Sequence, residues 1–320
     1  HYPLRRQRQM CIRDRCKDGY PLGFLINKGT TNNSDNLNKT FVSHTRQMAL
    51  LQKETIGYEG DLNSHSWRLT SDEGKHLNGT DLAPFPLGFF NASIHGDIVG
   101  RIFKTASKEN LSIDEIKCVV KNSYYLTGSF VKGDGEGHAE PTEINLDIKS
   151  SEDQSKIKNL VNKCSKSSPV LTALRTPLKN TFSLIANGRR KNLSSLNESS
   201  LDNPEDPYNY YKKQPSPSKN DFFSDRIIVK TGEVSSGKVE PVDGYNISKT
   251  SNNVSQNSNF NKIIRTIVGQ STTKSSDDII EVDTVLGLPG MTHFVIGMDF
   301  NGFIAPSPVN IIWAAISFCF

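Results

Sequence analysis

The hydrophobic and polar positions along the chain form two kinds of pattern, one typical of strands and one typical of helices. Alternating or short apolar runs predict strands at 41–58, 66–70, 113–131, 142–148, 181–185, 226–229, 263–268, 279–282 and 292–298. Helical spacing and start signals predict helices from Pro84 or Pro86, from Ser150 or Ser151 to about Lys163, near 169–174, and from Pro308. Strands that return through short turns, accompanied by a few helices, predict an α+β fold with an antiparallel sheet.

Two polar stretches interrupt this pattern. Residues 187 to about 220 are rich in Ser, Asn, Pro, Lys and Tyr, and residues 243–259 are rich in Asn and Ser. Segments with so few aliphatic side chains cannot build a core, so we predict a linker and a surface loop. The predicted organisation is a first domain at 41–186, a linker at 187–222 and a second domain at 223–320.

The two ends of the sequence differ from the rest. Five arginines fall within the first fifteen residues, whereas the remainder prefers lysine, asparagine, serine and isoleucine. A transit peptide or an arm that binds nucleic acid has such a composition, but the run Met10–Arg15 resembles translated sequencing adapter. We therefore expect residues 1–16 to be an artefact, and Cys11 and Cys16 receive no ligand role. The apolar run at 309–320 is shorter than the about twenty residues of a membrane span, and it predicts a buried helix cut by truncation of the second domain.

Composition excludes several classes of protein. Hydrophobic residues make up 35% and charged residues 22% of the 320 positions, which excludes a wholly disordered chain, a collagen and a coiled coil. The net charge of +4 is too small to indicate nucleic-acid binding. Five cysteines without regular spacing argue against a disulfide-built scaffold and suggest a reducing compartment. No signal peptide is recognisable, so we expect a cytoplasmic protein with neither a membrane nor a nucleic acid as partner.

An internal repeat is the most informative feature of the sequence. The segment 78–94 is similar to the segment 301–316 when one residue is allowed as an insertion. The matched pairs are Ala83 and Ala305, Pro84 and Pro306, Pro86 and Pro308, Ala92 and Ala314, and Ile94 and Ile316. Two prolines followed by a shared helical pattern indicate two tandem copies of one fold.

Both copies resemble the OsmC/Ohr family. The segment 305–319 is similar to the family's proline-led, alanine-rich helix, which carries a reactive cysteine about three turns in. Residues 72–86 are similar to the loop that enters this helix, and residues 168–174 resemble the segment with the family's second cysteine. The resemblance covers about 41–185 and 263–320. It implies a six-stranded antiparallel sheet with two main helices, in one complete copy and a truncated second copy that form an internal pseudo-dimer.

The resemblance also implies a chemistry, the reduction of organic hydroperoxides by a cysteine pair. A thiolate attacks the peroxide and becomes a sulfenic acid, a second cysteine condenses with it, and a dithiol reductant, lipoyl or thioredoxin-like, resets the pair. Cys319 corresponds to the attacking cysteine, whereas the first copy has Asp97 there and Ser168 at the second position. The partner of Cys319 is expected about seventy residues further on, outside this sequence. Cys164 is a displaced partner or, more simply, a buried structural residue.

A thiolate at Cys319 needs a nearby cation, because a helix dipole acts mainly within the first turn. The family's arginine corresponds to Arg68 in the first copy and most closely to His293 in the second. We therefore expect Arg68 to face Cys319 across the pseudo-dimer, with His293 as a substitute for the arginine. The alternative is that both are surface residues on exposed strands. Neither copy has the family's glutamate just after the helix-opening proline, which puts peroxidase activity in doubt.

Other interpretations stay open. One is a non-catalytic family member that serves as a scaffold or a small-molecule binding module. Another is an α+β protein in which Cys319 is simply a core residue. A metal site built from His65, His76, His95 and Asp97 is disfavoured, because His95 and Asp97 point in different directions on a helix and no zinc spacing is present. We predict no cofactor and assign no metal ligands.

Overall fold

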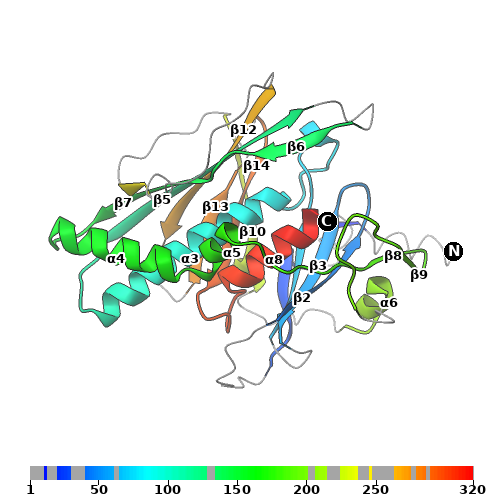
Figure 1. The fold of residues 1–320 in the computed structure, drawn as a ribbon, viewed down its shortest axis with the longest axis horizontal. Helices are drawn as coiled ribbons and strands as arrows, with labels where there is room; N and C mark the ends of the chain where they lie inside the picture. Colours follow the sequence, from blue (N-terminus) through cyan, green and yellow to red (C-terminus); the bar gives the residue numbers. More distant parts are fainter. Residues whose placement is uncertain are drawn as a thin grey trace.

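The computed structural model describes residues 11–12, 20–29, 40–60, 65–127, 134–200, 206–214, 224–236, 245–246, 263–274, 279–285 and 289–319. In this part of the chain, the strands form a four-stranded sheet, an eight-stranded sheet and a two-stranded hairpin (Figure 1). The strands within each sheet pair antiparallel. The predicted α+β class with antiparallel sheets is therefore confirmed.

The order of the strands mixes the two halves of the chain. The smaller sheet has the order β1 (Gly23–Asn27), β4 (Ser66–Ser71), β3 (Lys53–Glu59), β2 (Phe41–Gln47). The larger sheet has the order β10 (Ile228–Val234), β14 (Thr292–Asp299), β13 (Ile279–Thr284), β12 (Ile263–Lys274), β5 (Glu115–Thr127), β7 (Glu143–Lys149), β11 (Tyr245–Asn246), with β6 (Glu136–Ala139) paired to β5. The hairpin is β8 (Leu184–Ala186) with β9 (Arg189–Lys191).

The described helices are unequal in length. They are α3 (Pro86–Lys108), α4 (Gln154–Ser167), α5 (Pro169–Arg175), α6 (Pro207–Lys212), α7 (Ser224–Ile227) and α8 (Pro308–Cys319), with a short 3₁₀ turn at Lys75–Leu77. Proline begins α3 and α8 as predicted, since its missing N–H would have no partner in a first turn. None of the described helices is long and apolar enough to cross a membrane.

The two apolar helices α3 and α8 pack against each other and join the two sheets (Figure 1). Helix α3 contacts the larger sheet, and α8 contacts β2 and β3 of the smaller one. One apolar cluster runs through all four layers, with Trp67 from the smaller sheet, Phe89 from α3, Phe318 from α8 and Phe294 from the larger sheet. Burying such a side chain stabilises the fold by about 1.5–3 kcal/mol. The sandwiched position explains why α8 is apolar on nearly all sides.

The longest strand pairing joins the two halves of the chain. Strand β5 pairs with β12 from Lys117 opposite Thr272 to Leu126 opposite Ile263. The predicted domains at 41–186 and 223–320 therefore share one sheet, and their boundaries stay a prediction. The predicted linker at 187–222 contains structure of its own, namely β9 and α6, and α6 buries Tyr210 and Tyr211 against the smaller sheet.

The two loops that enter α3 and α8 share a hydrogen-bond pattern. The Asp72 N–H donates to the Pro84 carbonyl at 3.1 Å, and the Asp299 N–H donates to the Pro306 carbonyl at 3.2 Å. The carboxylate of each aspartate also accepts backbone N–H groups from its own loop; the donors are Glu73, Thr80 and Leu82 in the first, and Asn301, Phe303 and Ile304 in the second. Similar hydrogen bonds therefore hold the two loops at the starts of these helices.

Several details differ from the sequence prediction. The predicted strand at 41–58 is two strands, and the turn between them places Leu50 at a positive φ of 54°. The N-cap of α4 is Asp153 rather than Ser150 or Ser151, and its carboxylate accepts the Ser155 N–H at 2.7 Å. The predicted strand at 181–185 begins later, at Leu184.

Candidate functional site

Cys319 is the last residue of α8, and it is exposed. Its nearest charged groups come from the smaller sheet and the loop that follows it. The Lys53 ammonium donates a hydrogen bond to the Phe318 carbonyl at 2.7 Å, which holds this cation at the end of the helix. Surrounding protein atoms raise the pKa of the Cys319 thiol, Lys53 lowers it, and Glu73 raises it. The thiol therefore has a cation beside it but is not strongly activated.

Glu73 completes this small charged group. Burial raises the pKa of the Glu73 carboxyl, Lys53 lowers it, and Asp72 raises it. Lys53 thus interacts with both acidic groups, the thiol and the carboxyl. We call Cys319, Lys53 and Glu73 the thiol site.

Arg68 lies on the other face of the smaller sheet. Its guanidinium pairs with Glu54, with Nη2 2.6 Å from Oε2, and its side chain is about 5% exposed. It lies over the rings of Tyr211 and Phe24, at 4.9 and 5.6 Å. Neighbouring residues on a strand point to opposite faces, so Glu54 and Lys53 point in opposite directions. The structure therefore does not bring Arg68 to Cys319; the cation beside the thiol is Lys53, which the sequence analysis missed.

His293 also lies away from the thiol. On β14 the neighbouring Phe294 is buried in the core that includes Phe318, so His293 points to the opposite face of the larger sheet. Its Nδ1 is 3.1 Å from Oδ2 of Asp283 on β13. We expected His293 to take the place of the family's arginine, but the structure shows no contact between His293 and Cys319.

A second polar group is buried where α3 meets α5. The Ser168 hydroxyl donates a hydrogen bond to Oδ2 of Asp97, and Oδ1 of Asp97 lies 2.7 Å from Nη2 of Arg101. Burial raises the pKa of Asp97, whereas Arg101 and Ser168 lower it. The Ser168 oxygen also accepts the Leu171 N–H at 2.9 Å and so caps α5. Asp97 and Ser168, which the sequence analysis assigned to the two cysteine positions of the family, therefore lie in direct contact.

Two other cysteines are core residues. Cys118 on β5 and Cys164 on α4 are fully buried, and burial raises the pKa of both thiols. Neither is suited to attack a substrate from solvent.

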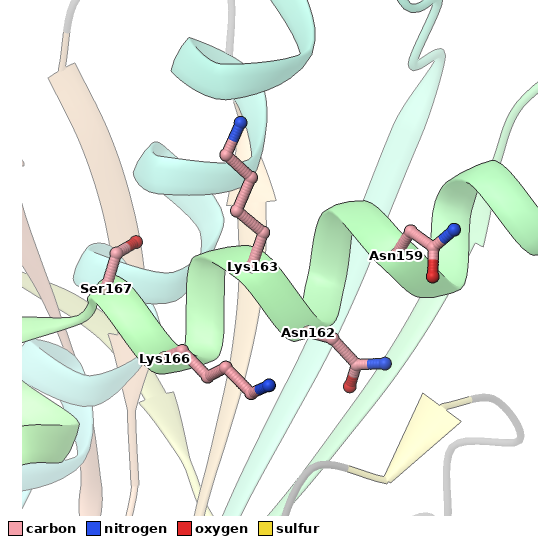
Figure 2. A pocket seen from close by; sticks show the side chains of 5 residues that line it. All are labelled: Asn159, Asn162, Lys163, Lys166 and Ser167. Atoms are coloured by element: carbon pink, nitrogen blue, oxygen red, sulfur yellow. The ribbon is translucent and has the colours of Figure 1, made fainter.

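A surface hollow lies along α4. Its lining side chains are Asn159, Asn162, Lys163, Lys166 and Ser167 (Figure 2). Lys163 forms an ion pair with Glu109 at the end of α3, so it ties the two helices together. The lining contains no cysteine and none of the residues of the thiol site, and we assign the hollow no function.

The fold and the thiol site define an α+β protein with an exposed cysteine, Cys319, at the end of a buried helix. No protein-family model and no curated protein matches the sequence. Among solved structures, the chain is similar to an OsmC-like hydroperoxide resistance protein from Jannaschia sp. CCS1, with 14% sequence identity and a TM-score of 0.31. The match covers 48% of this chain and 97% of that one. This similarity is too weak to assign a family.

Proposed function

We propose that the chain is an OsmC-like thiol peroxidase that reduces organic hydroperoxides through Cys319. The observation that carries the proposal is the hydrogen bond between Ser168 and Asp97. The resemblance assigns these residues, 71 positions apart, to the two cysteine positions of the family, and that assignment required them to be neighbours. Asp97 lies eleven residues after Pro86, and Cys319 lies eleven residues after Pro308. Cys319 of the second copy therefore corresponds to Asp97 of the first copy.

The internal pseudo-dimer is part of the same proposal. The matching loops before α3 and α8, the packing of these helices on each other and the pairing of β5 with β12 all support it. Each helix then packs on strands of the other copy, α8 on the smaller sheet and α3 on β13.

In the proposed reaction, the Cys319 thiolate attacks one oxygen of the hydroperoxide and the O–O bond breaks. The sulfur becomes a sulfenic acid, and the second oxygen takes a proton and leaves as an alcohol. A second thiol, proposed to lie in a segment beyond residue 320, displaces water from the sulfenic acid and forms a disulfide. A dithiol reductant, lipoyl or thioredoxin-like, reduces that disulfide to two thiols by thiol–disulfide exchange and is itself oxidised to a disulfide. Lys53 favours the attacking thiolate.

A non-catalytic scaffold or small-molecule binding module is the second candidate. Two observations favour it. The pKa of Cys319 is raised, so the less reactive thiol form dominates at neutral pH. The first copy has replaced both cysteine positions with the hydrogen-bonded pair Asp97 and Ser168.

The first chemical step can be tested on the chain as it is. The reduced protein is mixed with cumene hydroperoxide, the sulfenic acid is trapped with dimedone, and the adduct is mapped by mass spectrometry. We expect an adduct at Cys319 that forms faster than glutathione is oxidised at the same pH, and no adduct at this position with cumyl alcohol. The Cys319→Ser variant controls for the buried cysteines. A rate no higher than that of glutathione would contradict the peroxidase and favour the binding module.

A further inference from the structure

Three potential metal ligands lie together on one edge of the larger sheet. Glu233 is on β10, Asp283 on β13 and His293 on β14, strands that are neighbours in the order β10–β14–β13 (Figure 1). One ligand atom from each residue lies within 4.8 Å of the other two. Among the described residues, no other three His, Cys, Asp or Glu side chains lie close enough together to hold an ion.

Strand alternation explains why these side chains share a face. On β13 the neighbours Val282 and Thr284 are buried, and Asp283 between them is half-buried on the opposite side. His293 alternates in the same way with the buried Phe294. The ligand atoms therefore point away from α3 and toward solvent, which gives an ion access without opening the core.

The distances suit a small ion. His293 Nδ1 and Asp283 Oδ2 are 3.1 Å apart. Two ligand atoms that each lie about 2.1 Å from an ion are separated by about 3.0 Å at a right angle and about 3.4 Å at the tetrahedral angle. The pair can hold a metal with almost no movement of the two strands. Glu233, on the exposed edge strand, has more freedom to approach.

Asp283 supplies a second, independent observation. Its Oδ1 is enclosed by protein and has no hydrogen-bond partner, although a buried carboxylate oxygen is normally paired. Two carboxyl groups and an unpaired oxygen at one point favour the arrival of a cation.

We propose that Glu233, Asp283 and His293 bind a divalent transition-metal ion. One imidazole and two carboxylates suit zinc and the neighbouring metals of its row better than calcium or magnesium, which prefer oxygen ligands alone. Three protein ligands leave room for water as a fourth. The ion would tie edge strand β10 to β13 and β14. This proposal is independent of the thiol chemistry.

The test uses the reduced, metal-free chain without an affinity tag, titrated with Zn²⁺ by calorimetry and in thermal unfolding. We expect one equivalent to bind and the midpoint of unfolding to rise, because an ion that binds only the folded state stabilises it. His293→Gln and Asp283→Asn should each weaken binding by at least about tenfold. Each substitution keeps a polar side chain of similar size, so both variants should stay folded, and the metal-free form of each variant gives the baseline for its own unfolding midpoint.

The matched control is Glu281→Gln. Glu281 lies on the same strand and face as Asp283, but it pairs with Arg226, with Oε1 2.9 Å from Nε. This variant should bind zinc as the parent does. Because zinc also binds thiolates, Cys319→Ser is titrated in parallel and should retain the site. Unchanged affinity in His293→Gln, loss of binding in Cys319→Ser, or no rise in the parent's unfolding midpoint would each overturn the proposal.

Discussion

The Ser168 hydroxyl donates its hydrogen bond to Oδ2 of Asp97, a residue 71 positions earlier in the chain. Asp97 lies three turns into α3, and Ser168 is the N-cap of α5, so the bond ties the longest of the described helices to α5. Both residues are buried. The contact shows that the fold brings the side chains of these two positions together.

A cysteine pair placed at these positions is expected to form a disulfide. In the double variant Asp97→Cys with Ser168→Cys, oxidation should remove two thiols, and peptide mapping should join residues 97 and 168. The bridge should stabilise the oxidised form by about 2–4 kcal/mol relative to the reduced form in urea unfolding.

The single variant Asp97→Cys is the control and should keep its thiols. Cys164 lies one helical turn before Ser168, so mapping must distinguish a bridge to that residue. A bridge to Cys164, or no bridge at all, would argue against equivalence with the cysteine positions of the family.

The reactivity of Cys319 should depend on Lys53 and not on Arg68. In Lys53→Met the thiol loses its neighbouring cation, so the pKa of Cys319 should rise and its alkylation by iodoacetamide at neutral pH should slow. The rate is measured as a function of pH to give the thiol pKa.

Arg68→Met is the matched variant from the other face of the sheet. This substitution leaves the buried Glu54 carboxylate with one cation fewer, so it should lower the free energy of unfolding by about 3–5 kcal/mol. At a temperature where the variant stays folded, the pKa of Cys319 should equal that of the parent. If the pKa of Cys319 rises in Arg68→Met and not in Lys53→Met, Arg68 is the cation beside the thiol, as the sequence analysis expected.

Local signals predicted most of the fold. Pro86 and Pro308 marked the starts of both core helices, because the steric preference of proline acts within one turn. The turn at Leu50 was missed because it contains neither glycine nor proline, and tertiary packing holds its unusual φ. Helix α6 was missed because its tyrosines lie in a polar segment without a repeating pattern. They are buried by contacts with the smaller sheet, whose strands come much earlier in the sequence.

The candidate site was less predictable, for a different reason. Alternation indicates that Lys53 and Glu54 point to opposite faces, but it shows neither that Arg68 pairs with Glu54 nor which face α8 covers. That depends on how the second half of the chain packs on the first. The Glu233, Asp283 and His293 group has no sequence motif at all, because its members come from three strands that only the sheet brings together.

Tyr211 should contribute to stability through its hydroxyl, whose single proton is shared between two backbone carbonyls. Its hydroxyl lies 2.7 Å from the His44 carbonyl and 2.8 Å from the Glu54 carbonyl, on β2 and β3. Tyr211→Phe leaves these groups without this partner, so the free energy of unfolding should fall by about 1–3 kcal/mol in urea titration. Tyr208→Phe, on the same helix, should change it by less than about 0.5 kcal/mol. Equal effects would mean that α6 does not dock on the sheet in solution.

His95 should make the protein less stable in acid. The residue is completely buried in α3, and burial lowers its pKa from 6.5 to about 3. Below pH 6.5 the imidazole of His95 binds a proton in the unfolded chain but stays neutral in the folded protein. The contribution of neutral His95 to stability is therefore complete above pH 6.5 and is lost as the pH falls from 6.5 to 3. Between pH 6 and pH 4 this linkage lowers the free energy of unfolding by about 2.5 kcal/mol.

The comparison with His95→Gln isolates this contribution from that of the carboxyl groups. Urea unfolding at pH 6, 5 and 4 should show a smaller loss in His95→Gln than in the parent, by about 2.5 kcal/mol over the range. Ser93→Ala, a buried change on the same helix without a titrating group, should lower stability at every pH and keep the slope of the parent. If His95→Gln loses as much stability in acid as the parent does, His95 is protonated in the folded protein and α3 is more accessible to water than its packing indicates.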